Sequence, residues 1–358
     1  MASNAPEPGV VTGEAYQAVI QAAKEGGYAL PAVNVVGTNS VNAVLEAAAK
    51  AKSDVIIQLS NGGAQFFAGK GYPDTFEAKV LGAVSAAQHV HLLAKAYGVC
   101  VALHTDHANK KLIPWVEALI AHSEAHHERT GRPLFSSHML DLSEEPLEDN
   151  IALSAKALKR MAAIGMSLEI ELGVTGGEED GVGHDVEEGA DNSRLYTQPA
   201  DVLQAYEALS PIGHFSVAAS FGNVHGVYKP GNVQLRPEIL KNSQALVQAT
   251  HHTGPNPLHL VFHGGSGSEP AKIAEAVSYG VFKMNIDTDT QFAFAHPVGD
   301  YVKGHPVAFA HQLDPDTGAP YKKIYDPRKW LRKGEEGMVA RLQQAFEDLG
   351  STGKSVCR

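Results

Sequence analysis

The sequence predicts an α/β chain folded as a (β/α)₈ barrel, and three observations lead to this prediction. Eight short apolar segments alternate with segments of helical periodicity, which is typical of repeated βα units and a parallel sheet. The apolar segments are runs of small and branched residues, as in strands that are buried on both faces. Eight such units are the number that closes a barrel, whereas an open doubly wound sheet is the alternative interpretation.

The expected elements follow one another in order along the chain. An amphipathic helix over 14–24 comes first and is stopped by two glycines. The strands are expected at 29–36, 54–60, 101–107, 134–140, 167–173, 215–222, 258–262 and 281–284. The helices between them are expected at 40–52, 75–97, 111–129, 147–164, 199–209, 236–250 and 269–279. Residues 1–358 are therefore predicted to form a single TIM-barrel domain.

Two stretches do not fit this alternation. Residues 176–196 are rich in glycine and acidic residues and follow a strand end, so we expect a mobile, structureless lid over the site. Residues 291–358 run past the eighth strand and comprise an arm, 315–332, and a helix, 335–349. The barrel does not need this C-terminal arm to close, so the arm is a candidate for packing on a partner subunit.

The charge balance and the cysteines restrict the class of protein. The chain has 29 basic and 40 acidic residues and a formal net charge of −11, which disfavours nucleic acid or an anionic membrane as the main partner. No apolar run approaches the roughly 20 residues that a membrane helix needs, and residues 1–13 do not resemble a secretory signal. Cys100 and Cys357 are expected to be reduced, which favours a cytoplasmic location.

Three histidines, His107, His225 and His263, stand at or just beyond the ends of separate expected strands. A single histidine in such a place is more often structural. Three of them at the carboxyl edge of one barrel can meet in one site. Three protein ligands with an open fourth position are typical of catalytic zinc, so the sequence predicts bound Zn²⁺.

Other polar residues near these strand ends have two interpretations each. Asp106 either caps the following turn or exchanges a proton with the substrate beside the metal. Asp141 and Glu171 are further metal ligands or only balance the charge of the cation. His104 orients a ligand or only packs, and the pair that ends at Glu179 is a solvated acidic turn or supplies a general base.

Glycine-rich turns predict a phosphate site. Residues 263–268 follow a strand and open a helix, so their backbone N–H groups can approach an anion. Residues 285–288 end the eighth strand, and Lys229 adds a cation after the sixth. Loops after the seventh and eighth strands of barrels frequently bind phosphate. The residues thus indicate a barrel enzyme in which a metal polarises a carbonyl beside a carboxylate base, the arrangement that enolate formation requires.

Six motifs stand in order along the chain: Leu103–His107, Leu168–Gly173, Gly176–Gly181, Phe221–Asn232, Phe262–Ser268 and Lys283–Thr290. Together they resemble the motifs of class II fructose-1,6-bisphosphate aldolase. The resemblance covers nearly the whole chain, including Tyr325–Arg328 in the C-terminal arm. The length and the long loop resemble the branch of the family that forms homodimers. The stretch 182–190 is more acidic than the family pattern, and we assign it no role.

The resemblance implies a lyase that reversibly cleaves fructose 1,6-bisphosphate to dihydroxyacetone phosphate and glyceraldehyde 3-phosphate, in glycolysis and gluconeogenesis, through an enediolate stabilised by zinc. His107, His225 and His263 match the zinc ligands. Asp141 and Glu171 match a second or alternative metal position.

The resemblance also implies roles for residues that contact the substrate. Glu179 matches the base that takes a proton from dihydroxyacetone phosphate, and Asp106 matches the acid that protonates the developing C4 hydroxyl. Asn285 matches a residue that steadies the enediolate. Positions that match contacts to the phosphates and hydroxyls are Asn34, Ser60, Gly226, Gly264, Ser266, Asp287, Thr288 and, from the neighbouring subunit, Arg328. The family also binds a monovalent cation, Na⁺ or K⁺, beside the first phosphate.

Three other interpretations remain. Cleavage of tagatose 1,6-bisphosphate differs only at one hydroxyl-bearing carbon. A metal-dependent hydrolase would need an activated water and no phosphate loop. A non-catalytic metal-binding protein would not require a glutamate pair beside the site.

Overall fold

The sheet is built from the strands that the sequence predicts. The computed structural model describes residues 5–174, 176–179, 182–184, 196–225, 235–265 and 268–357. In these parts of the chain, one curled sheet contains nine parallel strands, in the order β1 (Gly9–Val10), β4 (Cys100–Thr105), β3 (Val55–Leu59), β2 (Leu30–Asn34), β12 (Val281–Ile286), β11 (Leu260–Phe262), β9 (Phe215–Ala219), β6 (Ser167–Leu172) and β5 (Ser137–Leu140). The eight expected strands are confirmed, and β1 is an additional short strand.

The sheet closes on itself between β4 and β5. The backbone N–H of Ser136 donates to the carbonyl of Leu103 at 2.9 Å. One residue further along both segments, the ring Nδ1 of His104 lies 2.8 Å from the hydroxyl of Ser137. The strands β2, β3, β4, β5, β6, β9, β11 and β12 therefore form a ring in chain order, and the predicted barrel is confirmed rather than the open sheet.

The barrel interior has an apolar half and a polar half. Near the starts of the strands, small side chains such as Ala32 and Ala102 pack together, and the expected first helix, α1 (Gly13–Gly26), closes this end with Tyr16 and Ile20. Inward positions recur every second residue along a strand. Toward the carboxyl ends these positions are polar and at most 2% exposed: Gln58, His104, Glu169, Glu171 and Lys283.

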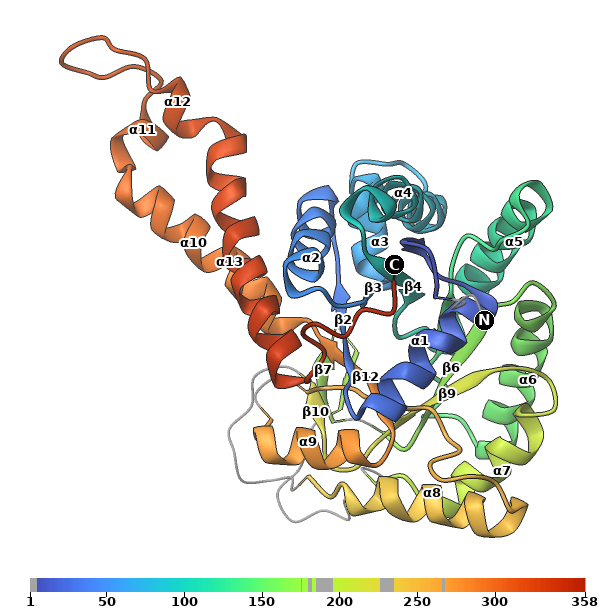
Figure 1. The fold of residues 1–358 in the computed structure, drawn as a ribbon. Helices are drawn as coiled ribbons and strands as arrows, with labels where there is room; N and C mark the ends of the chain where they lie inside the picture. The colour runs from blue at the N-terminus through green and yellow to red at the C-terminus, as the bar shows by residue number, and fades with distance from the viewer. Residues whose placement is uncertain are drawn as a thin grey trace.

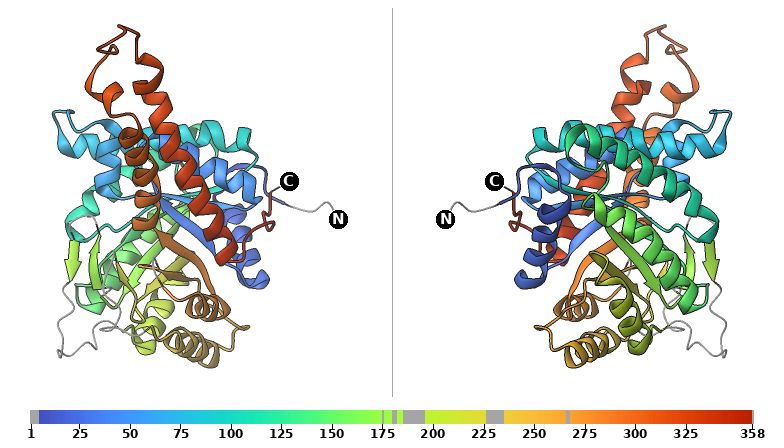
Figure 2. Two further views of the ribbon diagram at one scale, coloured as in Figure 1. Left: turned by 90° about the vertical axis from the view of Figure 1, so that its left-hand side faces the viewer. Right: turned by 90° about the vertical axis from the view of Figure 1, so that its right-hand side faces the viewer.

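Helices cover the outside of the barrel (Figures 1 and 2). They are α2 (Thr38–Ala51), α3 (Asn61–Ala68), α4 (Thr75–Tyr97), η1 (Lys110–Leu112), α5 (Ile113–Thr130), α6 (Leu147–Ala163), α7 (Pro199–Leu209), α8 (Glu238–His251) and α9 (Pro270–Ser278). Among the described residues, none of the helices has the length and apolarity to cross a membrane. The short helix α3, which begins at the end of β3, is an element that the sequence pattern did not indicate.

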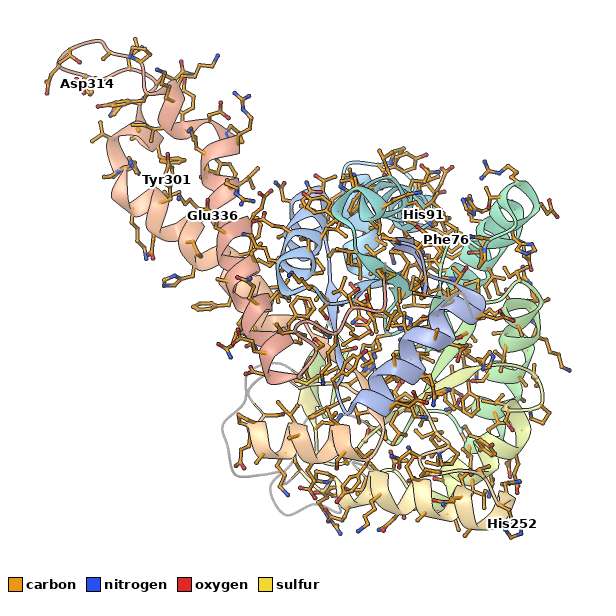
Figure 3. All side chains as sticks on the ribbon, in the orientation of Figure 1. Phe76, His91, His252, Tyr301, Asp314 and Glu336 are labelled. Atoms are coloured by element: carbon orange, nitrogen blue, oxygen red, sulfur yellow. A yellow bond between two sulfur atoms is a disulfide. The ribbon has the colours of Figure 1, made fainter. Side chains whose placement is uncertain are left out.

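The C-terminal arm projects from the barrel. The helices α10 (Thr288–Gly304) and α13 (Pro327–Asp348) run side by side, with α11 (Pro306–Ala310) and α12 (Lys322–Tyr325) at the far end (Figure 1). Figure 3 shows Asp314 at the tip of the arm. The helix expected at 335–349 begins earlier, at Pro327, because Asp326 accepts a hydrogen bond from the N–H of Arg328 and a proline suits the first helical turn. The packing of the C-terminal arm on a partner subunit stays a prediction.

After α13 the chain returns to the start of the strands and ends beside β4. The hydroxyl of Ser355 donates to one carboxylate oxygen of Asp54 at 2.6 Å, and the N–H of Val356 donates to the other at 2.9 Å. Cys357 forms a disulfide with Cys100, and their Cα atoms are 5.9 Å apart. The expectation that both cysteines are reduced is therefore wrong. A pairing across 257 residues leaves no local pattern in the sequence.

The stretch 176–196 begins as a small sheet, so the expectation of a structureless lid is wrong for its first part. The strand β7 (Gly176–Glu179) pairs with β8 (Val182–His184) in antiparallel and with β10 (Val224–His225) in parallel orientation. Residues 185–195 lie outside the described residues. Closure of this segment over the site stays a prediction.

Candidate active site

Asp106, directly after β4, is a fully buried carboxylate held by three amides. Its Oδ2 accepts from Nδ2 of Asn34 at 3.1 Å and from Nε2 of Gln58 at 2.9 Å. Its Oδ1 accepts from Nδ2 of Asn285 at 3.1 Å. The partners come from β2, β3 and β12, so the carboxylate is fixed in the barrel mouth rather than at the start of a helix.

His107 has a backbone conformation that is rare for a residue other than glycine. Its φ is 37°, in the left-handed region, and its N–H contacts Sδ of Met139 at 3.3 Å. The ring Nδ1 lies 3.1 Å from Oδ2 of Asp141 and 3.6 Å from Oε2 of Glu171. Neighbouring side chains in a strand point to opposite faces. This turn therefore allows Asp106 and His107 to face the same site.

His263, directly after β11, meets His107 across the barrel mouth. Its Nδ1 lies 3.0 Å from Nε2 of His107, and the two rings meet edge to face. Its other nitrogen, Nε2, lies 2.8 Å from Oε1 of Glu169. Burial lowers the pKa of His263, although Glu169 acts in the opposite direction, so the ring is neutral at pH 7 and retains a lone pair for a cation.

Two overlapping groups of side chains fit a divalent cation. One is Asp106, His107 and His263, and the other is His107, Asp141 and Glu171, with the candidate atoms of each group within 4.8 Å of one another. Burial acts to raise the pKa of Asp141, but hydrogen bonds from His107 and Ser143 hold it well below its usual value. A carboxylate beside imidazole nitrogens is a donor set that suits zinc.

Several predicted site residues are only partly described. Gly226, Lys229 and Ser266 lie outside the described residues. For His225 and Glu179 the structure describes the backbone, in β10 and β7, and their side chains lie outside the description. These two strands are neighbours in one sheet, with His225 opposite Gly177. The roles of all five residues stay predictions.

The remaining predicted residues occupy strand ends, helix starts or the arm. Ser60 caps α3 by accepting from the N–H of Gly63, and Gly264 has a φ of 60°. Asp287 and Thr288 open α10. Arg328 is separate from this group, because it lies on the arm with 88% of its side chain exposed and pairs with Asp326.

Sequence reasoning missed three buried polar residues, Gln58, Glu169 and Lys283. Besides its bond to Asp106, Nε2 of Gln58 donates to Oδ1 of Asn34 at 2.6 Å. The Oε1 of Gln58 and the Oδ1 of Asn285 are buried without a hydrogen-bond partner among the described residues, which is expected of groups that meet a ligand. The available signal was a polar residue at an inward position of an otherwise apolar strand.

Known proteins resemble this chain along almost its whole length. Residues 14–354 match the family model described as fructose-bisphosphate aldolase class-II. The fructose-bisphosphate aldolase of Haemophilus influenzae is 56% identical over 348 residues, which are 96% of each chain. The class 2 enzyme of Escherichia coli K12 is 56% identical over 350 residues, covering 96% of this chain and 97% of that one.

Structure comparison leads to the same family. The crystal structure of fructose-bisphosphate aldolase from Campylobacter jejuni superposes with a TM-score of 0.88 at 55% identity and covers 98% of both chains. The family's function is the reversible cleavage of fructose 1,6-bisphosphate, and its members are metal-dependent lyases. With the match spanning the barrel, the carboxyl edge and the arm alike, this chain belongs to the class II fructose-bisphosphate aldolase family.

Proposed function

We propose that this chain cleaves fructose 1,6-bisphosphate reversibly with zinc as its metal, held by His107, His225 and His263. The observation that carries the proposal is the approach of His107 to His263, at 3.0 Å between ring nitrogens, beside the caged carboxylate of Asp106. Asp141 and Glu171 provide a second, adjacent position for the cation. When bound, the ion supplies a Lewis acid that polarises the substrate carbonyl.

The protein's own groups move the protons. Glu179, on β7, removes a proton from dihydroxyacetone phosphate to give an enediolate, which Asn285 steadies through its amide. Asp106 protonates the developing C4 hydroxyl in condensation and takes this proton back in cleavage. The three amides around Asp106 support this assignment, since they fix the carboxylate in one orientation without supplying a competing proton.

The substrate is anchored by its two phosphates. Residues proposed for the phosphate next to the carbonyl, together with a Na⁺ or K⁺ ion, are Gly226, Lys229, Gly264, Ser266, Asp287 and Thr288. Gly264 supports this placement because it directly follows His263 and its positive φ of 60° suits the tight backbone turn of an anion site. Asn34 and Ser60 contact the other half of the substrate.

The far phosphate is proposed to meet Arg328 of a second copy in a homodimer. Arg328 lies on the projecting arm, so it suits contact with another subunit better than with its own barrel (Figure 1). The arm also exposes large apolar side chains, which mark interaction surfaces; they are Phe292, Val307, Phe309 and Leu313. Sedimentation of the purified protein tests this point, and a monomer at micromolar concentration would contradict it. We further propose that the enzyme works in the cytoplasm, as expected of a glycolytic aldolase; the disulfide between Cys100 and Cys357 does not support this location.

The first experiment is cleavage of fructose 1,6-bisphosphate with and without EDTA, with tagatose 1,6-bisphosphate in parallel. The proposal expects activity that EDTA removes and zinc restores, with fructose 1,6-bisphosphate preferred. Preference for the tagatose substrate would keep the mechanism and change the substrate. Failure of metal-loaded protein to cleave either sugar would contradict the proposal.

A second experiment isolates the base. Glu179→Gln is expected to keep zinc and substrate binding but to lose proton exchange at dihydroxyacetone phosphate. Exchange at the wild-type rate would place the base elsewhere.

A further inference from the structure

A buried charged layer lies directly beneath the candidate metal site. Glu169 of β6, Lys283 of β12 and His104 of β4 are each at most 2% exposed and come from three separate strands. The Nζ of Lys283 donates to both carboxylate oxygens of Glu169, at 2.9 Å each. Lys283 therefore holds the carboxylate of Glu169 in place, and the contact of Oε1 with His263 sets its rotation.

This fixed carboxylate faces one nitrogen of His263. Oε1 of Glu169 lies 2.8 Å from Nε2 of His263, whereas Nδ1 of the same ring faces His107. A carboxylate accepts a hydrogen bond, so the ring proton is placed on Nε2 and the lone pair on Nδ1. The ring thus presents its lone pair toward the candidate metal position.

A buried ion pair needs an explanation beyond stability. The loss of solvation usually offsets the attraction between two buried charges, and apolar side chains of similar size are often at least as stabilising. Glu169 is surrounded by Lys283, His104 and His263, and the Nζ of Lys283 and the Nε2 of His263 lie within 2.9 Å of its carboxylate oxygens. An apolar side chain of similar size could not accept a hydrogen bond from His263 at this depth.

We propose that Glu169 is a positioning residue that orients His263 for metal binding, and that Lys283 holds Glu169 in place and balances its charge. Carboxylates that accept from metal-binding histidines set the ring's orientation and its basicity. The inference rests on the proposed function, in which His263 is a metal ligand. His104 has a different place in the layer, because its Nδ1 bonds to Ser137 and its Nε2 is 3.5 Å from Glu169.

The test compares three variants for metal affinity, without relying on activity. Glu169→Gln removes the charge, Lys283→Met removes the cation, and the double variant Glu169→Gln/Lys283→Met removes both. Zinc affinity is measured by competition with a chelator, and the ligand geometry is read from the visible spectrum of the cobalt-substituted protein. Thermal unfolding of the metal-free proteins reports stability separately.

We expect Glu169→Gln and the double variant to bind zinc about 10–100-fold more weakly, with an altered cobalt spectrum. Lys283→Met alone is expected to lose the most thermal stability, because it leaves a buried carboxylate without its cation. The double variant is expected to recover much of that stability but not the affinity. This separation distinguishes positioning from a merely structural role, and it remains measurable if a single variant does not fold.

A matched control is Glu124→Gln, which breaks the pair between Glu124 and Arg160 on the outer surface and should leave zinc affinity unchanged. Wild-type affinity and an unchanged cobalt spectrum in the double variant would overturn the inference. His263→Ala with wild-type zinc affinity would instead overturn the ligand assignment of the proposed function. The two failures are therefore distinguishable.

Discussion

The interior of the barrel and the base of the arm use similar ion pairs in opposite surroundings. Inside the barrel, Lys283 and Glu169 are at most 2% exposed. At the base of the arm, the guanidinium of Arg332 donates to both carboxylate oxygens of Glu46 on α2, at 2.7 and 3.0 Å, with side chains 43% and 20% exposed. Exposed pairs contribute little because water and salt screen them, whereas a broken buried pair leaves an uncompensated charge.

The largest effect on activity is expected from substitution of the candidate metal ligands. His107→Ala and His263→Ala should each lose bound zinc and more than about 100-fold of the cleavage activity, beyond what changes to outer-shell partners cost. Metal content after dialysis and the cleavage rate measure this. Full zinc occupancy in either variant would show that the histidine is not a ligand.

Asp106→Asn is expected to have the next largest effect. The amide of the new residue cannot take the proton from the C4 hydroxyl, which should slow cleavage about 10²–10⁴-fold. Its NH₂ group would also face the amide N–H donor of Asn34 or Asn285. Zinc content should stay at the wild-type level, since the histidines remain. Initial rates and metal analysis test this, and near-normal cleavage would mean that Asp106 is only structural.

The next effect is expected from removing the disulfide between Cys100 and Cys357, which lies far from the candidate active site. Cys357→Ser is expected to lower the free energy of unfolding by about 2–4 kcal/mol and to leave cleavage unchanged, because the bond lies at the opposite end of β4 from Asp106. Thermal unfolding with and without dithiothreitol measures this. Dithiothreitol should lower the Tm of the wild type and leave that of the variant; equal Tm values throughout would contradict the prediction.

The smallest effect is expected at the arm. Arg332→Ala should cost less than about 1 kcal/mol at pH 7, because the pair with Glu46 is partly exposed. Arg332 lowers the pKa of Glu46 to about 2 from a usual value of 4.5, so its contribution is present above pH 4.5 and is lost as the pH falls toward 2. Urea unfolding of the wild type and the variant at pH 7 and near pH 2 checks this. A stability difference between them that is larger near pH 2 than at pH 7 would contradict the prediction.

Local sequence patterns predicted the barrel. Features that depend on contacts between residues far apart in sequence could not be predicted from these patterns. The strands and their polar ends were predicted from runs such as Val101–His107, in which apolar residues are followed by ionisable ones. The ion pair between Glu169 and Lys283 joins two strands, and the two residues are 114 positions apart in sequence. The disulfide joins two cysteines that are 257 positions apart. His107 was predicted as a ligand, but its positive φ was not, because only the packed turn beside Met139 imposes it.

The segment after α13, residues 349–357, returns to β4, and this path also determines how the molecule would respond to mechanical force. Gly9 of β1 pairs with Cys100, and Cys357 is bonded to the same residue. When the oxidised chain is stretched between residues 5 and 357, the load passes through Cys100, so most of the barrel and the whole arm stay outside the force path. Full extension would then release about 330 Å of chain, against about 1,200 Å after reduction. The covalent bond therefore makes the catalytic half of the molecule a mechanically shielded loop.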